Sequence, residues 1–341
     1  MSTKTTYRAY SLNSFSVSDI KENERNLVSP LPHQVVIRVK AVSLNFRDLL
    51  VARGHYNPNL PLPAVPTSDG AGEIVEVGSA VKTFKVGDRV SPNFMPEWHS
   101  GRVTPAAAKG ALGGFVDGML QEYKVLDELS LVKIPDHLSY EEAATLPCAA
   151  LTAWNGLFVN GDLKPGQTVL TMGTGGVSIF ALQLAKMAGA RVISTSSSEA
   201  KLERLKELGA DETINYKSQP NWDEAVLKLT DGVGVDHVVE VGGAGTLERS
   251  VKAVRFGGHV SVIGVLAGVQ GSVSPLMVIM KAAALKGVFV GSRTMFEEMN
   301  AAIALHKLKP VIDRYYKAEQ IVEALAYMES GQHFGKIVLS L

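Results

Sequence analysis

Cysteine is almost absent from this chain of 341 residues, in which Cys148 is the only one. A single cysteine excludes a disulfide within the chain and is typical of a protein from a reducing compartment. An excess of either charge is also absent, because Lys plus Arg and Asp plus Glu both number 34. With no basic block and no nucleic-acid-reading motif, the sequence argues against a nucleic-acid partner.

Long apolar runs are missing as well. No stretch approaches the ~20 apolar residues that span a bilayer, and residues 1–10 lack the apolar core of a secretory signal. We therefore expect a cytoplasmic protein with no membrane partner. Hydrophobic residues make up 46% of the chain and charged residues 20%, which is enough to bury large cores and predicts two domains.

The most informative stretch is a glycine turn at residues 173–176. It follows a short apolar strand at 168–172 and precedes a run from 177 to 188 whose apolar residues recur at helical spacing. In this context a glycine string binds a dinucleotide, because the backbone approaches the pyrophosphate closely and the helix N-terminus offers free N–H groups. The predicted contacts are Gly173, Thr174, Gly175, Gly176 and Val177.

Ser178 stands where the third glycine of such a string belongs. Serine is small enough for close packing of the helix on the strand, so we treat this departure as minor. The alternative is a tight turn between strand and helix that binds no ligand.

Strands and helices alternate along the second half, which predicts an α/β doubly wound parallel sheet of the Rossmann type. The expected strands are 168–172, 191–195, 212–215, 236–241, 259–265 and 285–290. The expected helices after the first are 199–208, 222–229, 246–254 and 275–283. The first half instead carries short strands between Gly and Pro signals, at 33–42, 70–78 and after 85–88, and a long loop at 91–118, which indicates a β-rich domain.

Between the first two of these strands, the segment 45–56 reads as one or two helical turns ended by Gly54. The motif residues of this segment are Asn45, Phe46, Asp48, Arg53, Gly54 and Tyr56. Further strings follow in order at 69–73, 87–90, 146–149, 151–153, 173–176 and 335–338. In this combination the chain resembles the medium-chain dehydrogenases/reductases, which include the zinc-type alcohol dehydrogenases, and among them the zinc-free quinone oxidoreductase-like branch.

The resemblance spans nearly the whole chain. It implies a GroES-like catalytic domain at 1–135, completed by 292–341, and a Rossmann dinucleotide-binding domain at 136–291. It also implies that the final helix (318–328) and strand (336–339) return to the first domain. Members of this branch commonly pair as homodimers edge to edge, and 285–290 is a suitable apolar edge.

Zinc-dependent members of the family place Cys where Asn45 stands and a His-Glu pair where Ser68 and Asp69 stand. Asn and Ser are poor Zn²⁺ ligands, and Cys148 alone matches a third ligand position. The loop at 91–118 contains none of the cysteines of a structural zinc site. We therefore predict no metal, with Cys148 packed as a small hydrophobe.

The end of the second Rossmann strand favours NADPH over NADH. An NAD site places a carboxylate there for the ribose 2′-hydroxyl, whereas this chain has serines until Glu199. We expect Ser196, Ser197 and Lys201 to receive a 2′-phosphate. Alternatively, Ser196 and Glu199 form a capping box that simply starts the helix, and the two interpretations can coexist.

The resemblance implies further cofactor contacts. Tyr216 would lie beside the adenosine phosphate, while Thr152 and Lys336 would reach the diphosphate and nicotinamide ribose. Additional implied contacts are Gly242, Gly243, Gly264 and Val265 at strand ends, and Gly291 and Ser292 beside the nicotinamide. Each glycine alone is also consistent with a plain turn.

Without a metal, the substrate must be an acceptor activated by conjugation, such as a quinone or an α,β-unsaturated carbonyl, or must be polarised by hydrogen-bond donors. Asn45 is the candidate for positioning the nicotinamide ribose and substrate oxygen, and Tyr56 for donating a proton. Asp48 orders this turn, or forms a structural ion pair with Arg53. Trp98 and His99 either line the pocket or only pack.

These observations predict an NADPH-dependent, zinc-independent reductase of quinones or enones that acts by direct hydride transfer. Two alternatives stay open. One is an alcohol dehydrogenase or carbonyl reductase, and the other is a protein that binds NADPH without turnover.

Overall fold

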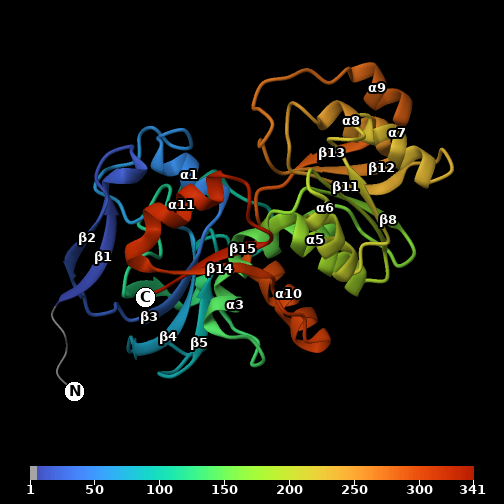
Figure 1. Cartoon of the computed structure of the whole chain (residues 1–341). Coiled ribbons are helices and arrows are strands. Elements are labelled where there is room, and N and C mark those ends of the chain that lie inside the picture. Colours follow the sequence, from blue (N-terminus) through green and yellow to red (C-terminus); the bar gives the residue numbers. More distant parts are fainter. Residues whose placement is uncertain (1–5) are drawn as a thin grey trace. The chain divides into compact units, whose positions relative to one another are not determined.

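The computed structural model describes residues 6–341 and divides the chain into two compact units (Figure 1). Unit 1 comprises Met1–Leu151 and Gly291–Leu341, and unit 2 comprises Thr152–Val290. Among residues 6–341, no helix has both the length and the apolar character needed to cross a bilayer.

Unit 1 is built on a seven-stranded, mostly antiparallel sheet. In spatial order its strands are β14 (Ile312–Lys317), β15 (Lys336–Ser340), β3 (Gln34–Ser43), β4 (Asp69–Val77), β5 (Arg89–Pro92) and β7 (Leu131–Lys133), and β6 (Tyr123–Asp127) also pairs with β3. The predicted strands 33–42 and 70–78 are confirmed to within one residue at each end. The return of the last strand to the first domain is also confirmed, because β15 pairs with β3.

Several elements of unit 1 were not predicted, among them a hairpin and a long helix. The hairpin of β1 (Thr6–Leu12) and β2 (Ile20–Asn26) precedes the predicted strands. Helix α10 (Arg293–His306) follows directly after the segment that joins the two units. The other helices of this unit are α1 (Phe46–Ala52), α2 (Pro105–Lys109), α3 (Tyr140–Ala144) and α11 (Ile321–Glu329).

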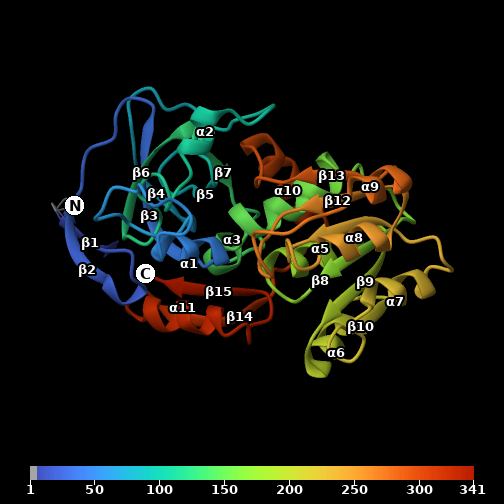
Figure 2. The same cartoon turned by 90° about the horizontal axis from the view of Figure 1, so that it is seen from above.

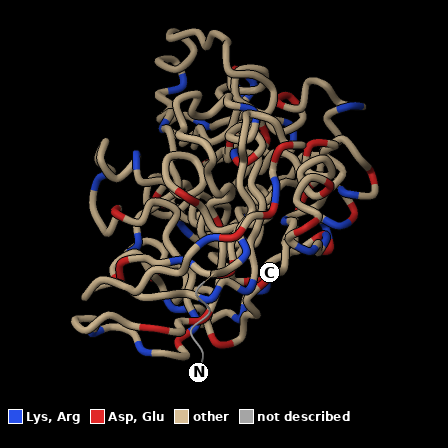
Figure 3. The backbone as a smooth tube through the Cα atoms, turned by 90° about the vertical axis from the view of Figure 1, so that its left-hand side faces the viewer, with Lys and Arg blue, Asp and Glu red and all other residues tan. Residues whose placement is uncertain are grey.

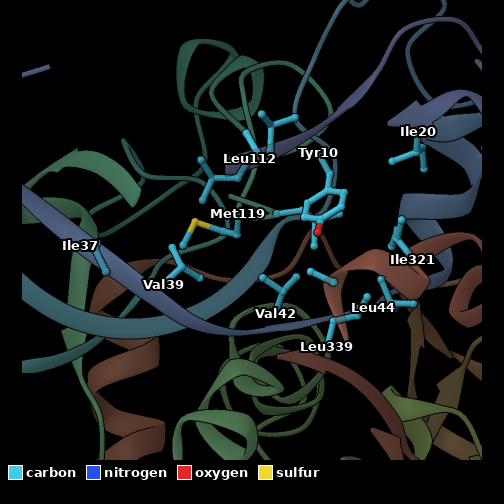
Figure 4. Close-up of a cluster of buried hydrophobic side chains, with 14 of the residues drawn as sticks. Tyr10, Ile20, Ile37, Val39, Val42, Leu44, Leu112, Met119, Ile321 and Leu339 are labelled. Carbon is cyan, nitrogen blue, oxygen red and sulfur yellow. The ribbon is translucent and has the colours of Figure 1, made fainter. Parts of the chain in front are cut away.

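The core of unit 1 gathers segments that are far apart in sequence. Figure 4 shows Val39 and Val42 of β3 with Tyr10, Met119 and Ile321 around one interior. Strand β3 is buried on both faces along most of its length, which is why its sequence is nearly continuously apolar after residue 34. Full burial of one such aliphatic side chain contributes about 1.5–3 kcal/mol.

Unit 2 contains six parallel strands. Their spatial order is β10 (Glu212–Asn215), β9 (Arg191–Ser196), β8 (Thr168–Met172), β11 (Val235–Glu240), β12 (Val254–Val262) and β13 (Ala284–Gly287). The order reverses between β8 and β11, and ligands of open α/β sheets bind at the carboxyl ends of strands at such a switch point. The predicted doubly wound fold is confirmed.

Helices connect the strands of unit 2 and cover both faces of its sheet (Figure 2). They are α5 (Gly176–Met187), α6 (Glu199–Glu207), α7 (Trp222–Leu229), α8 (Leu247–Ala253) and α9 (Pro275–Lys281). A short helix α4 (Leu151–Trp154) lies between two π-helical segments, Leu146–Ala150 and Asn155–Val159. The apolar stripe of residues 139–157 predicts one helix or a pair of helices in this stretch.

Two predicted strands of unit 2 have the wrong bounds. Strand β12 starts at Val254 instead of 259, and its pairing with β11 shifts register between Val235 and His237. Strand β13 ends at Gly287 instead of 290, and Val290 adopts a left-handed φ of 55° that extended structure does not allow. Gly257 and Gly258, which precede the predicted strand, lie inside β12.

Acidic and basic residues are present in equal number and are distributed over the whole chain. Figure 3 shows Lys and Arg interspersed with Asp and Glu. Many are paired locally, such as Lys186 with Asp211 at 2.8 Å on the surface of unit 2. Exposed pairs of this kind contribute about 0–1 kcal/mol each, so they shape the surface field more than the stability.

Two buried histidines face each other in the sheet of unit 2. His237 on β11 is paired in register with His259 on β12, and their ring centroids are 6.1 Å apart. His237 is 4% exposed, and its Nε2 atom lies 3.0 Å from Gln167 Oε1. Burial lowers the pKa of His237 from 6.5 to about 4, and the neighbouring His259 lowers it further. The imidazole therefore stays neutral in the folded state.

We expect unit 2 to lose stability as the pH falls from about 6.5 towards 4. In this range the unfolded His237 binds a proton that the folded one rejects, so stability present above the unfolded pKa is lost on acidification. The pKa shift corresponds to roughly 3 kcal/mol for this residue. Urea denaturation of His237→Gln at several pH values should give a flatter profile than the parent. The exposed His55→Gln should leave the profile unchanged, and equal slopes in all three proteins would contradict this assignment.

Candidate functional site

The glycine turn of unit 2 leaves open space at the start of α5. Gly173 has a φ of 72°, which L side chains rarely adopt, whereas Gly175 is the N-cap residue of α5 with an ordinary extended backbone. A Cβ atom built on either glycine would meet nothing within 4 Å. Neither a close neighbour nor the backbone requires glycine at 175, so its missing side chain serves to keep the helix N-terminus open.

The residue in the third-glycine position behaves as predicted. Ser178 is buried in the first turn of α5, and its hydroxyl donates a hydrogen bond of 2.6 Å to the Met172 carbonyl at the end of β8. Helix and strand therefore approach closely even though no glycine is present. The hydrogen bond also satisfies a carbonyl at the carboxyl edge of the sheet.

The corner after β9 differs from the predicted capping box. Strand β9 continues through Ser196, and helix α6 has Ser198 as its N-cap residue. Glu199 accepts a hydrogen bond from the Asn215 amide, while Ser196 Oγ accepts one of 3.4 Å from the Ser198 N–H. The capping-box interpretation is wrong, because Ser196 still belongs to the strand.

The structure brings the ends of β9 and β10 together. The Tyr216 N–H donates to the Ser196 carbonyl at 3.1 Å, and the Tyr216 residue is 40% exposed. Ser197 and Lys201 are half-buried on the same corner. Hydroxyl, ammonium and phenol groups thus occupy the place where an NAD site carries a carboxylate.

Several predicted glycine contacts are explained by packing within unit 2. A Cβ atom on Gly242 would lie 2.2 Å from Thr246 Oγ1, and one on Gly264 would lie 2.3 Å from the Val241 carbonyl oxygen. Gly243 has a positive φ of 83°. The plain-turn interpretation accounts for all three, and only Val265, which is 40% exposed, presents a side chain there.

A buried carboxylate at the end of β11 was missed. Glu240 is fully buried and accepts hydrogen bonds from the N–H groups of Gly242 and Gly243 at 2.7 and 3.0 Å, and from Thr246 Oγ1 at 2.6 Å. It fixes the loop that follows β11. A glutamate directly before a Gly-Gly pair, at the end of an apolar strand, is the signal that identifies it.

Three further predicted contact residues are buried, hydrogen-bonded or closely packed within their own surroundings. Thr152 is 3% exposed in α4. Ser292 is the N-cap residue of α10, and its hydroxyl accepts a hydrogen bond of 3.3 Å from the Met295 N–H. A Cβ atom on Gly291 would lie 2.8 Å from Leu151 Cγ. Their position is therefore established, and a role towards a cofactor stays a prediction.

In unit 1 the structure joins two predicted residues that are 291 positions apart. The Lys336 ammonium donates to Asn45 Oδ1 at 2.6 Å and to the Leu44 carbonyl at 2.5 Å. Lys336 is 3% exposed on β15, and Asn45 is 9% exposed at the N-cap position of α1. Burial lowers the pKa of Lys336, and the Asp69 carboxylate opposes that shift.

Ser68 and Asp69 extend this cluster at the start of β4, and both are fully buried. The Asn45 amide donates to Ser68 Oγ at 3.4 Å, and Ser68 donates to Asp69 Oδ1 at 2.7 Å. The second oxygen of Asp69 accepts the Cys148 N–H at 3.1 Å. Burial raises the pKa of Asp69 and of the Cys148 thiol, and the Asp69 carboxylate raises the thiol pKa further.

The predicted ion pair between Asp48 and Arg53 does not form. Asp48 is buried in α1, accepts the Asn45 N–H at 2.8 Å and lies 3.6 Å from the Arg47 guanidinium. Arg53 instead pairs with Glu329 at 2.7 Å on the surface. The helix carries Asp48 inward and Arg53 past its end, so the two cannot meet. Burial raises the pKa of Asp48 to about 6, although Arg47 opposes this.

Tyr56 is half-buried beside the same helix. The Arg47 guanidinium lies 4.6 Å from the centre of its ring, and Phe115 contacts its edge with ring centroids 6.0 Å apart. Among residues 6–341, no hydrogen bond engages its hydroxyl. Arg47, which no sequence motif singles out, therefore connects the Tyr56 ring to Asp48.

The long loop is ordered by packing. Trp98 is 6% exposed, and its ring N–H donates to the Gly101 carbonyl at 3.0 Å. His99 is exposed, and its carbonyl accepts from the Thr294 N–H at 3.0 Å. The packing interpretation suits Trp98.

Comparison with known proteins supports the same family. Residues 176–305 match the model of the zinc-binding dehydrogenases, and residues 31–136 match that of the alcohol dehydrogenase GroES-like domain. A zinc-type alcohol dehydrogenase-like protein of Schizosaccharomyces pombe is 47% identical over 317 residues, which cover 91% of each chain. The chain therefore belongs to the medium-chain dehydrogenase/reductase superfamily. It is an oxidoreductase of that superfamily and depends on a nicotinamide cofactor.

Other relatives divide between several activities. A crystal structure of an NAD-dependent alcohol dehydrogenase is 36% identical, covers 98% of this chain and 99% of its own, and superposes with a TM-score of 0.90. A 2-methylene-furan-3-one reductase of Solanum lycopersicum is 33% identical and covers 97% of this chain and 78% of its own. Names of further relatives include quinone oxidoreductases and an NADPH-dependent enzyme.

Proposed function

We propose that this protein is an NADPH-dependent, zinc-independent oxidoreductase of the quinone oxidoreductase-like kind that reduces quinones or enones by direct hydride transfer. The observation that carries this proposal is the buried contact between the Lys336 ammonium and the Asn45 amide. The positive charge and hydrogen-bond donors of this cluster come from side chains. They supply what the zinc-dependent relatives obtain from a metal.

The residues of unit 2 fit a dinucleotide. The free N–H groups at the start of α5 face space that a Cβ at Gly175 would enter, which suits a pyrophosphate. The corner of Ser196, Ser197, Lys201 and Tyr216 offers donors for a 2′-phosphate. When bound, NADPH supplies the hydride. Thr152 and Lys336 would hold the diphosphate and the nicotinamide ribose, as the resemblance implies.

The residues of unit 1 do not fit zinc. The Asn45 amide oxygen already accepts the Lys336 ammonium, and the Ser68 hydroxyl donates to Asp69, so neither presents a thiolate or imidazole. The raised pKa of Cys148 disfavours the thiolate that zinc requires. An ammonium at this position also repels a divalent cation. The donor chemistry thus supports a metal-free reaction.

A quinone or enone is already activated by conjugation, so the site has only to stabilise the charge that forms on its oxygen. Hydride addition to a quinone or enone places negative charge on an oxygen, and donors aimed at that oxygen stabilise it. Lys336 has three N–H groups and uses two on Leu44 and Asn45. The Tyr56 hydroxyl is free to donate a proton. Asp48 holds the Asn45 backbone and thereby orders the turn that carries these groups.

A substrate panel tests the proposal through the absorbance of NADPH. The purified protein should oxidise NADPH with 1,4-benzoquinone or a simple enone, and activity should survive a chelator. Stoichiometric tightly bound zinc with chelator-sensitive oxidation of an alcohol would instead favour an alcohol dehydrogenase or carbonyl reductase. Tight NADPH binding with silence across the panel would identify a binding protein.

The cofactor preference gives a sharper prediction. We expect a lower KM for NADPH than for NADH, and Lys201→Ala should raise the KM for NADPH about tenfold, as loss of one charge-assisted hydrogen bond does. Lys206→Ala is the matched control, because Lys206 lies on the same helix and pairs with Glu203 at 2.8 Å. A preference for NADH, or an equal effect of both substitutions, would reject the 2′-phosphate corner.

The edge of unit 2 favours a homodimer. Within the described part of the chain, strand β13 pairs with a strand on one side only, and helix α9 exposes Leu276, Ile279 and Met280 by 64–71%. An uncovered apolar helix face and an open strand edge are both typical of an interface. Light scattering at micromolar concentration should therefore report twice the mass of 36.5 kDa.

A further inference from the structure

Four buried side chains in unit 1 form one directed chain of hydrogen bonds. Lys336 donates to Asn45 at 2.6 Å, Asn45 donates to Ser68 at 3.4 Å, and Ser68 donates to Asp69 at 2.7 Å. None of the four residues is more than 9% exposed. They come from β15, the cap of α1 and the start of β4, so three separate elements meet in one polar line.

The chemistry of the two ends fixes the orientation of the groups between them. An ammonium has only hydrogens to offer, so the oxygen of the Asn45 amide must face Lys336. A carboxylate has only acceptors, so the Ser68 hydrogen must face Asp69. The Ser68 lone pairs are then left for the Asn45 N–H₂ group. Asp69 is itself held by the Cys148 N–H at 3.1 Å.

We propose that Ser68 and Asp69 are positioning residues for the reaction: they hold the Asn45 amide, and through it the Lys336 ammonium, in the orientation that serves the cofactor and substrate. This inference rests on the proposed function for the role of Lys336. Both residues would act through the Asn45 amide, to which Ser68 is hydrogen-bonded. Ser68 turns the amide, and Asp69 fixes the hydroxyl hydrogen and balances the buried ammonium.

The presence of these four hydrogen-bonded polar side chains in the interior has to be explained, because apolar residues in their place would avoid the desolvation of two charges. Orientation is the explanation, since a reacting group misplaced by about 1 Å loses up to 100-fold in rate. The bond of 3.4 Å between Asn45 and Ser68 is the longest in the chain. Loss of the Ser68 hydroxyl removes this bond, and with it the contact that joins the amide to Ser68 and Asp69.

The test is a double-mutant cycle between Ser68→Ala and Asn45→Ala. We expect Ser68→Ala to lower kcat about tenfold or more in the parent, with the KM for NADPH changed less than about threefold. The same substitution should have no further effect on kcat in the Asn45→Ala protein, because its action passes through that amide. Equal losses in both backgrounds would overturn the proposal.

Ser43→Ala is the matched control. Ser43 is also fully buried, and its hydroxyl donates one hydrogen bond of 3.2 Å to the Ile337 carbonyl. It should lose a similar amount of thermal stability without a change in kcat. Ser68→Thr, which restores a hydroxyl, should recover activity relative to Ser68→Ala. Equal activity of Ser68→Ala and Ser43→Ala would contradict a positioning role.

The pH profile isolates Asp69. Its carboxylate opposes the lowering of the Lys336 pKa by burial, so Asp69→Asn should lower that pKa further. The alkaline limb of kcat/KM should then move to lower pH, because the ammonium loses its proton sooner. A purely structural loss would reduce the whole profile without moving this limb, and that result would count against the proposal.

A readout without turnover separates this inference from the proposed function. In nitrogen-15-labelled protein, the side-chain amide signals of Asn45, identified by their loss in Asn45→Ala, should shift in Ser68→Ala and stay in place in Ser43→Ala. If the substrate panel is silent and these shifts occur, the proposed function fails while the positioning chain stands. Unmoved Asn45 signals in Ser68→Ala would overturn the inference whatever the panel shows.

Discussion

Gly175→Val is expected to abolish useful dinucleotide binding while the protein still folds. The first carbon of the new side chain meets nothing within 4 Å, so the structure accepts it. The valine methyl groups, however, fill the space in front of the α5 N-terminus, where the pyrophosphate is proposed to bind. We expect the Kd for NADPH to rise at least about 100-fold, or roughly 2.7 kcal/mol. Fluorescence titration measures this directly.

The stability of that variant is the internal check. Valine is a poorer N-cap residue than glycine, which costs about 1 kcal/mol at most. Gly287→Val is the matched control, since Gly287 also has no neighbour within 4 Å and no positive φ, but lies on β13 away from the glycine turn. It should keep parental affinity. Parental affinity in Gly175→Val would mean that the turn binds no ligand.

Lys336→Met is expected to destabilise unit 1 by about 3–5 kcal/mol, the usual penalty for leaving one charge of a buried pair without its partner. Asp69 is fully buried, and the raised pKa that burial gives it already shows how poorly the site tolerates its charge. Urea denaturation of the variant should show the loss at neutral pH. Part of it should vanish at acidic pH, where Asp69 takes up a proton.

A second substitution identifies the cause. Asp69→Asn in the Lys336→Met protein removes the orphaned charge and keeps an oxygen for the Cys148 N–H, so stability should largely return, while activity should not. Arg53→Met provides the contrast, because the Arg53 and Glu329 side chains are 41% and 46% exposed. Its cost should stay below about 1 kcal/mol. A loss from Lys336→Met that Asp69→Asn leaves unchanged would point to lost packing alone.

Local signals in the sequence predicted much of this fold. Helix α7 and strand β10 were predicted to the residue, because apolar periodicity and flanking polar residues define both. Gly54 was read correctly as the end of α1, since its left-handed φ of 71° is what glycine permits. Strand β13 was predicted too long because nothing in the sequence shows that Val290 adopts a positive φ.

The candidate site could be predicted only in part. Asn45, Asp48 and Lys336 were predicted from the motifs at 45–56 and 335–338, but nothing in the sequence indicates that residues 45 and 336 are in contact. The wrong pairing of Asp48 with Arg53 arose because sequence spacing says little about which side of a short helix is buried. Ser68 and Asp69 were read only as missing zinc ligands. Their own hydrogen bonds become visible once β4 and α1 are brought together.

The place of Lys336 on β15 has a consequence for how the protein is made. Strand β15 inserts beside β3, so unit 1 is completed by residues that are synthesised after the whole of unit 2. Unit 2, encoded between residues 152 and 290, has all its strands well before that moment. A nascent chain can thus contain every strand of the unit 2 sheet while the strand that carries the buried ammonium does not yet exist, and a premature stop near residue 330 would release a chain that lacks Lys336 and the hydrogen bonds it makes to Leu44 and Asn45.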